Sequence, residues 1–417
     1  MHAIEKILAK SAGQSSVSKG EIFNCEVDIA GINDLYLQTI RSFYEMGGKK
    51  VYDPKKIIVF LDHYSPPSTI AQADNQKLFR EFCWNQGIEL LMDIDQGVCH
   101  QVIADNGLVY PGMVVVVTDS HSTTHGAFGA FGTGVGATDL AIILMTGKLW
   151  FRIPEVIRIN LEGELPKGVY AKDIILHIIG SLGADYALYK AVEFAGPTFQ
   201  KLSMSERMTL CNMTTEMGAK TSYIQPDDIT INYLNSKGNH DYEIYTSDLD
   251  YEYASELTFN VSELKPQLAA PHSVDNVSSV ERFIGIQINQ AYLGSCTNGR
   301  IEDIEIAAKI LKGKKVHNGT RLVVVPASKG VFLEAMNKGY VQILVEAGAT
   351  FVTPSCAACL GTHQGLLASG DICITSTNRN FPGRMGSPKA EIYIGSPASV
   401  AAAALEGQIV DPSKYID

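Results

Sequence analysis

Short apolar segments alternate with longer helix-like stretches along the whole chain. Residues 57–61, 114–117 and 321–326 are almost continuous apolar runs, which predict strands buried on both faces of a sheet. Alternation of such runs with helical periodicity is typical of α/β proteins with mainly parallel sheets. We therefore expect an α/β fold.

Polar side chains follow directly after two of these predicted strands. Asp62 and His63 come after the first, and Asp119, Ser120 and His121 come after the second. A single Asp or His in such a place is more often a cap or turn residue. Because the sites of parallel α/β sheets gather beyond the carboxyl ends of their strands, two such endings together predict a functional site.

Residues 126–137 are rich in glycine. Gly132, Gly134 and Ala137 have the spacing of a dinucleotide-binding turn, but that turn needs its first glycine directly after a strand. Here the glycines follow the 114–117 strand by about a dozen residues. We expect them instead to let a helix pack closely under the site.

The length of 417 residues predicts more than one domain. We expect three α/β domains, over residues 1–154, 155–281 and 282–417. The first boundary follows a helix predicted to include residues 140–150. The second follows a segment rich in Tyr, Asp, Glu and Ser and a predicted linker over residues 275–280.

Composition narrows the class of protein. Hydrophobic residues make up 46% and charged residues 19%, which is ordinary for a globular protein. A net charge of −11 argues against a nucleic-acid binder, although a local group of arginines can still hold an anionic substrate. The sequence shows neither a membrane-spanning run nor a secretory signal, and eight cysteines are too sparse for a disulfide scaffold. We expect a cytoplasmic protein.

Three cysteines carry the most chemical information. They are Cys296, in Gly-Ser-Cys-Thr-Asn, and the C-x-x-C pair Cys356 and Cys359. Three thiolates can hold an iron–sulfur cluster by three of its irons, which leaves the fourth iron open to a substrate. On spacing alone, a zinc site completed by His363 or a dithiol redox pair fits equally well.

A second polar motif lies near the C-terminus. Arg379 and Arg384 flank a predicted Pro-Gly turn in residues 378–384. A guanidinium group pairs in bidentate fashion with a carboxylate. Two of them on one bend predict a site for a di- or tricarboxylic acid, while a pair of surface arginines is the alternative.

Taken together, the motifs resemble those of the aconitase superfamily over nearly the whole chain. The length is similar to that of the large subunits of its two-subunit dehydratases. The resemblance rests on eight motifs in family order: 61–63, 100–101, 118–121, 192–194, 211–213, 294–298, 356–361 and 378–384.

The resemblance implies three aconitase-like domains around a cleft that holds a [4Fe–4S] cluster. Cys296, Cys356 and Cys359 would be its ligands. The implied reaction is that of a hydro-lyase, which removes water from a hydroxy acid and adds it back at the neighbouring carbon. The zinc, redox and nucleotide interpretations lose most of their weight.

The resemblance also assigns roles to the acid, base and binding residues. His63, held by Asp62, would donate a proton to the departing hydroxyl, and His100 with Asp119 would form a supporting pair. Glu193 would lie near the iron-bound water. The residues expected to contact or orient the substrate are Asn33, Ser120, His121, Asn378, Arg379 and Arg384.

We expect one part of the superfamily to lie on a separate chain. The proton-abstracting serine of the family lies on a swivelling fourth domain, for which we find no counterpart here. We expect a separate small subunit to carry it, as in the split members of the family. The favoured substrate is isopropylmalate, of leucine biosynthesis, and homoaconitate or dimethylmalate is the alternative. A different kind of alternative is a non-catalytic metal-binding protein on the same scaffold. The bulky Leu35, Tyr36 and Leu37 depart from the small residues usual in the family and bear on the substrate pocket.

Overall fold

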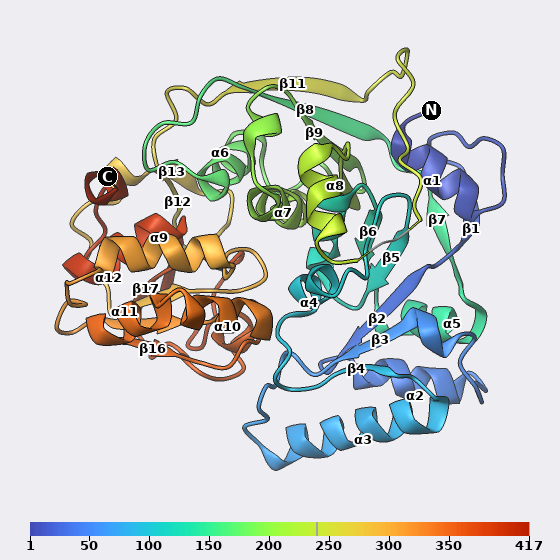
Figure 1. Ribbon diagram of the computed structural model, residues 1–417, viewed down its shortest axis with the longest axis horizontal. Helices are drawn as coiled ribbons and strands as arrows, with labels where there is room; N and C mark the ends of the chain where they lie inside the picture. Colours follow the sequence, from blue (N-terminus) through green and yellow to red (C-terminus); the bar gives the residue numbers. More distant parts are fainter. Residues whose placement is uncertain (239–240, 417) are drawn as a thin grey trace.

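The computed structural model describes residues 1–238 and 241–416, in which three main sheets each have helices packed against them (Figure 1). The five-stranded sheet has the order β4-β3-β2-β5-β6, and all of its strand pairs are parallel. Its strands are β2 (Ile29–Asn33), β3 (Ile57–Phe60), β4 (Leu90–Met92), β5 (Val114–Val117) and β6 (Phe131–Gly134). The helices of this part are α1 (Ala3–Ser11), α2 (Leu37–Glu45), α3 (Ile70–Gln86), α4 (Cys99–Asp105) and α5 (Ala137–Thr146).

Strand β5 is apolar at every position because it is buried on both faces. Val114 and Val116 join one hydrophobic core, with residues of α1, α2 and α5. Val115 and Val117 join another core, with residues of α4 and of the second sheet. Because successive side chains of a strand point to opposite faces, a strand covered on both faces must be apolar at every position. The expected α/β fold is confirmed.

The second sheet is four-stranded and parallel, in the order β10-β9-β8-β11. It shares the larger hydrophobic core with the first sheet, so apolar side chains of the two parts pack against one another. Its strands are β8 (Val156–Glu162), β9 (Ala191–Ala195), β10 (Thr221–Ile224) and β11 (Ser255–Asn260), and its helices are α6 (Ala171–Leu182), α7 (Met204–Met213) and α8 (Asp228–Asn235).

The third sheet lies on the left of Figure 1, with helices α9 to α12 drawn in orange and red. Its order is β13-β12-β18-β17-β14-β15-β16, parallel except at the two pairs of β12. The strands are β12 (Gln267–Ala269), β13 (Val277–Ser279), β14 (Gln290–Leu293), β15 (Arg321–Val324), β16 (Ala349–Phe351), β17 (Ile372–Thr375) and β18 (Glu391–Ile394). The helices are α9 (Ile301–Leu311), α10 (Lys329–Asn337), α11 (Tyr340–Ala347) and α12 (Pro397–Glu406).

Two local predictions were wrong. The helix expected through residue 150 ends at Thr146, because Gly147 takes a left-handed backbone (φ +71°) and the chain enters β7 (Lys148–Arg152). Strand β7 pairs in antiparallel fashion with β1 (Ile22–Glu26). The expected linker over residues 275–280 contains β13, which pairs with β12.

The division into three domains stays a prediction. The three main sheets fall in successive parts of the chain, but β12 and β13 precede residue 281 and belong to the third sheet. A second boundary before Gln267 therefore fits the sheet pairing better than one at residue 281. In the described part of the chain, no helix is long and apolar enough to cross a membrane.

The glycine-rich segment permits close packing, as expected, but through a different element. Residues 120–128 form a 3₁₀ helix, and an α-helix begins only at Ala137. A Cβ atom on Gly126 would lie 2.2 Å from the carbonyl oxygen of Ser222 in β10, and one on Gly134 would lie 2.5 Å from that of Asp119. The glycines therefore let this 3₁₀ helix and strand β6 approach neighbouring backbone.

We predict that Gly126→Ala lowers the free energy of unfolding by about 1–3 kcal/mol, because the added methyl group must displace backbone. Urea unfolding followed by circular dichroism measures the change. Gly136→Ala is the matched control, since a Cβ atom there would have no neighbouring atom within 4 Å and its backbone is not left-handed. Equal stability of the two variants would contradict the prediction.

Candidate iron–sulfur active site

The three cysteines come from loops at one edge of the third sheet. Cys296 follows β14, while Cys356 and Cys359 lie in the turn that follows β16. Strands β14, β15 and β16 are parallel neighbours, so their carboxyl ends meet at the same edge. The three side chains are buried, with residue exposures of 5%, 7% and 1%.

Both cysteine loops hold a strained residue. Ser295, just before Cys296, has φ +88°, and Ala357, just after Cys356, has φ +43°. Residues other than glycine adopt this left-handed region at an energetic cost, and such strain gathers where a site fixes the backbone. The strain at both positions is consistent with a site that constrains the two cysteine loops.

Hydrogen-bond donors lie beside two of the three sulfur atoms. Asn212 and Asn378 place their Nδ2 atoms 3.2 and 3.5 Å from the Cys296 sulfur. The Nη2 of Arg384 lies 3.8 Å from the sulfur of Cys359. The hydrogen bond with Cys356 lowers the pKa of Cys359 to about 5 against the effect of burial, and Arg384 adds to the lowering. The surroundings therefore favour an anionic sulfur at this position.

The donor set of this site fits an iron–sulfur cluster. Three buried cysteines lie on neighbouring loops of one sheet edge, and thiolates are the ligands that such a cluster takes. Amide and guanidinium groups beside the sulfurs of Cys296 and Cys359 supply the hydrogen bonds that tune such a centre.

The first Asp–His pair is tied to the cysteine loop through the backbone. The Cys356 amide donates to the Asp62 carbonyl at 2.9 Å, and Thr362 Oγ1 donates to the His63 carbonyl at 3.1 Å. The side chain of His63 binds Asp62, with Nδ1 and Oδ1 2.7 Å apart. Its Nε2 faces Asp119 Oδ2 at 3.7 Å. Burial lowers the pKa of His63, but Asp62, Asp119 and Asp34 together more than offset this, and the pKa lies well above its ordinary value.

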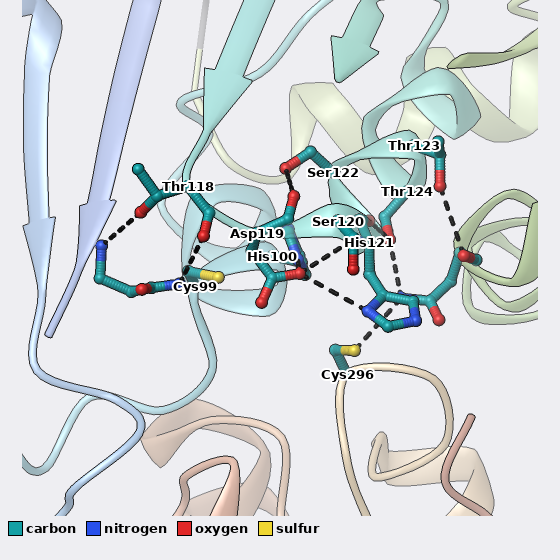
Figure 2. A network of polar contacts seen from close by, with 12 residues as sticks. Cys99, His100, Thr118, Asp119, Ser120, His121, Ser122, Thr123, Thr124 and Cys296 are labelled. Carbon is teal, nitrogen blue, oxygen red and sulfur yellow. Dashed lines mark hydrogen bonds and ion pairs between the residues drawn. The ribbon is translucent and has the colours of Figure 1, made fainter. Parts of the chain in front are cut away.

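Asp119 pairs with His100 and also contacts His121, as Figure 2 shows. Its Oδ1 is 2.9 Å from His100 Nε2 and accepts the His121 amide at 2.8 Å. Burial opposes the charge, but His100 and the other imidazoles hold the pKa of Asp119 well below its usual range. Cys296 approaches the same group from a separate loop, below it in the figure. The structure thus brings both Asp–His pairs to the cysteine edge.

Comparison with known proteins identifies the family. The pattern of the aconitase family (aconitate hydratase) matches residues 5–285 and 276–407. The chain belongs to the aconitase family. The resemblance seen in the sequence is thereby confirmed.

Close relatives within the aconitase family cover the chain end to end. One is 3-isopropylmalate dehydratase large subunit 1 of Methanopyrus kandleri, 47% identical over 99% of both chains. Another is the probable methanogen homoaconitase large subunit of Methanothermobacter thermautotrophicus, 46% identical over 99% of this chain and 98% of its own. The crystal structure of Thermococcus kodakaraensis aconitase X in its holo form shares the fold, with a TM-score of 0.53 and 13% identity over 90% of this chain and 89% of that one.

Sequence reasoning missed one residue of this aconitase-family site. Glu216 Oε1 lies 2.8 Å from both His121 Nε2 and Arg379 Nε. Arg379 Nη2 also donates to Ser120 Oγ at 3.0 Å. Glu216 lies on a short turn after α7, close to the Cys211-Asn212-Met213 motif, but no local pattern marks it. Its importance comes from partners distant in the sequence.

Glu193, in contrast, forms its polar contacts with a different set of residues. Its Oε2 is 2.6 Å from His2 Nε2 and accepts from Tyr253 at 3.0 Å, and Arg158 lies 3.8 Å from its other oxygen. None of these partners is a predicted site residue. The placement of Glu193 near an iron-bound water therefore stays a prediction, whereas Glu216 is the glutamate whose contacts join His121 and Arg379.

The remaining predicted residues lie around the same edge. Asn33 donates to the Thr118 carbonyl at 3.3 Å, while its buried Oδ1 has no partner among the described residues. The neighbouring Asp34 holds the His63 amide at 2.9 Å. His363, the zinc alternative, places Nε2 3.1 Å from the His63 carbonyl, so that nitrogen is engaged with backbone.

We predict that Asp62→Asn removes a pH-dependent part of the stability of the metal-free chain. Because the folded pKa of His63 is raised, its contribution is fully present below the unfolded value of about 6.5 and is lost as pH rises through the folded value. The variant should be less stable by about 2 kcal/mol at pH 6, as for a charged hydrogen bond. In urea unfolding curves recorded at rising pH, the difference should shrink as His63 loses its proton in the folded chain, and a constant difference would contradict the assignment.

Proposed function

We propose that this chain is the large subunit of a [4Fe–4S] hydro-lyase of the 3-isopropylmalate dehydratase type. One observation carries the proposal: three buried cysteine sulfurs with amide and guanidinium donors share an edge with two Asp–His pairs. Cys296, Cys356 and Cys359 hold the cluster. When bound, the cluster supplies a Lewis-acidic iron that weakens the carbon–oxygen bond of a hydroxy acid.

His63 is the proton donor to the departing hydroxyl, which leaves as water. Its Nδ1 is held by Asp62 at 2.7 Å, so the proton to be transferred resides on Nε2. The raised pKa keeps this imidazole protonated near neutral pH. His100 pairs with Asp119 and so offsets the negative charge of that carboxylate. Glu216 pairs with His121 and fixes the orientation of its imidazole ring.

Cationic and hydroxyl groups near the cysteines bind the carboxylates of the substrate. Arg379 is fixed by Glu216 and Ser120, and Arg384 lies against the Cys359 sulfur. Asn378 donates to both the Cys296 sulfur and Thr297 Oγ1, which orients the cysteine loop. A net charge of −11 would repel an anionic acid, so these arginines reverse the potential locally.

The base that takes the carbon-bound proton belongs to a small subunit. Relatives that this chain matches over 99% of their length carry the name large subunit. The active enzyme is therefore a heteromer in which the small subunit supplies the swivelling domain. We place it in the cytoplasm.

Isopropylmalate is the proposed substrate, within leucine biosynthesis, because the dehydratase names recur among relatives from several organisms. Homoaconitate is the second candidate, since a probable homoaconitase large subunit is 46% identical. Mixing the reconstituted chain with its small subunit and assaying both acids decides between them. Turnover by the mixture and none by the separate subunits is expected, and strong activity of this chain alone would refute the split-subunit proposal.

We predict that Cys359→Ser abolishes the brown cluster, because two remaining cysteines cannot anchor the cubane. Iron and sulfide content after anaerobic reconstitution measures this, with about four of each expected for the unmodified chain. Cys83→Ser, at another buried cysteine in α3, is the control and should keep full iron content. A colourless unmodified chain with tightly held zinc would overturn the cluster assignment.

We predict that His63→Ala keeps the cluster and lowers kcat by about 10²–10⁴-fold, the usual loss for a general acid. The visible spectrum should be unchanged and activity with the small subunit nearly lost. Retained activity in this variant would assign the proton transfer to another group.

A further inference from the structure

The guanidinium of Arg300 lies where three parts of the site meet. Its Nη2 donates to the Cys296 carbonyl at 2.7 Å, and its Nη1 donates to the Thr297 carbonyl at 2.6 Å. Its Nε donates to Gln101 Oε1 at 2.9 Å. Gln101 follows His100 in helix α4. One side chain, 2% exposed, thus binds both the cysteine loop and the helix of a catalytic histidine.

A third element completes this arrangement. Arg300 Nη1 also lies 3.2 Å from the Ser205 carbonyl and from Thr209 Oγ1, both in α7. All of these acceptors are neutral oxygens. A buried guanidinium is costly unless its N–H groups are bonded, and its planar fork allows only one arrangement of such acceptors. Displacing any of the three elements would leave buried polar groups without partners.

Gln101 also forms a hydrogen bond within α4. Its Nε2 donates to Asp105 Oδ1 at 2.8 Å, and Asp105 Oδ2 accepts from Ser328 Oγ at 2.5 Å. The amide of Val98 donates to the Ala327 carbonyl at 2.9 Å. Both ends of α4 are therefore attached to the same loop, between β15 and α10 of the third part, and Arg300 binds the helix between these two points.

We propose that Arg300 is a positioning residue that fixes the Cys296 loop relative to His100, with Gln101 as the connecting side chain. The expected effect of Arg300 on turnover rests on the proposed function. The hydrogen bonds that connect the Cys296 loop to α4, in contrast, are a property of the metal-free chain. Arg300 acts on two neighbours through separate atoms: Nη1 and Nη2 hold the cysteine loop, and Nε holds α4. The two effects can therefore be separated by substitution.

Two variants of the full chain test the two contacts. Arg300→Lys loses the planar fork, so the reconstituted cluster should be lost to a chelator about 10- to 100-fold faster, the usual range for residues that support metal ligands. In the metal-free chain, hydrogen exchange should rise in residues 294–300 and in residues 98–105. Gln101→Met keeps the carbonyl contacts, so it should raise exchange only in residues 98–105.

Activity with the small subunit provides a further distinction. Gln101→Met should lower kcat about tenfold with KM within about twofold and a nearly normal rate of cluster loss, because only the histidine helix is loosened. Arg321→Lys is the matched control for the arginine. Its Nε also donates to a glutamine, Gln290, at 3.1 Å, and its side chain is 54% exposed. This control should leave exchange in both segments and the rate of cluster loss unchanged.

Three outcomes would overturn the proposal. Unchanged exchange of residues 98–105 in Arg300→Lys removes the link, and an equal rise throughout the chain assigns Arg300 to general stability. Unchanged hydrogen exchange together with unchanged kcat in Gln101→Met also refutes the proposal. This test still applies if Arg300→Lys does not fold. If the unmodified chain forms no cluster, the proposed function fails, while the exchange measurements still decide the link.

Discussion

Buried negative charge at the meeting point of three sheets is the constraint on which this structure depends. Asp119, Asp62 and Glu216 are carboxylates with little exposure, and the cysteine sulfurs beside them are anionic when they bind metal. An unpaired charge in such surroundings costs several kcal/mol. Each charge is therefore matched by a histidine, arginine or amide, and the matching partner often comes from a different sheet.

This matching explains why the site lies between parts of the chain rather than within one. His121 belongs to the first part, its partner Glu216 follows α7 of the second, and Arg379, which shares that glutamate, comes from the third. Short loops beyond parallel strands bring such groups together without long flexible connections. The strained backbone at Ser295 and Ala357 lies in the two cysteine loops of the same site, and such strain persists only where the surrounding structure holds it.

Expected contacts form where the paired residues are contiguous in the sequence. Asp62 and His63 are neighbours in the chain and pair as expected, and the C-x-x-C turn sets Cys356 and Cys359 close together. Glu193 and Glu216 show the opposite case. Glu216 is 95 residues from His121, and Glu193 finds His2 across 191 residues. No local pattern distinguishes a glutamate that faces the site from one that supports the N-terminus.

The sequence by itself determined the α/β class, the cysteines suited to a cluster and the strand endings that carry Asp and His. These properties are local, since they depend on side-chain periodicity and on chemical identity over a few residues. Tertiary structure alone decided which glutamate belongs to the site, where helix α5 ends and how Arg300 joins its loop to α4. The physical reason is that these outcomes depend on hydrogen bonds between residues far apart in the chain, whose partners are chosen only when the sheets pack against one another.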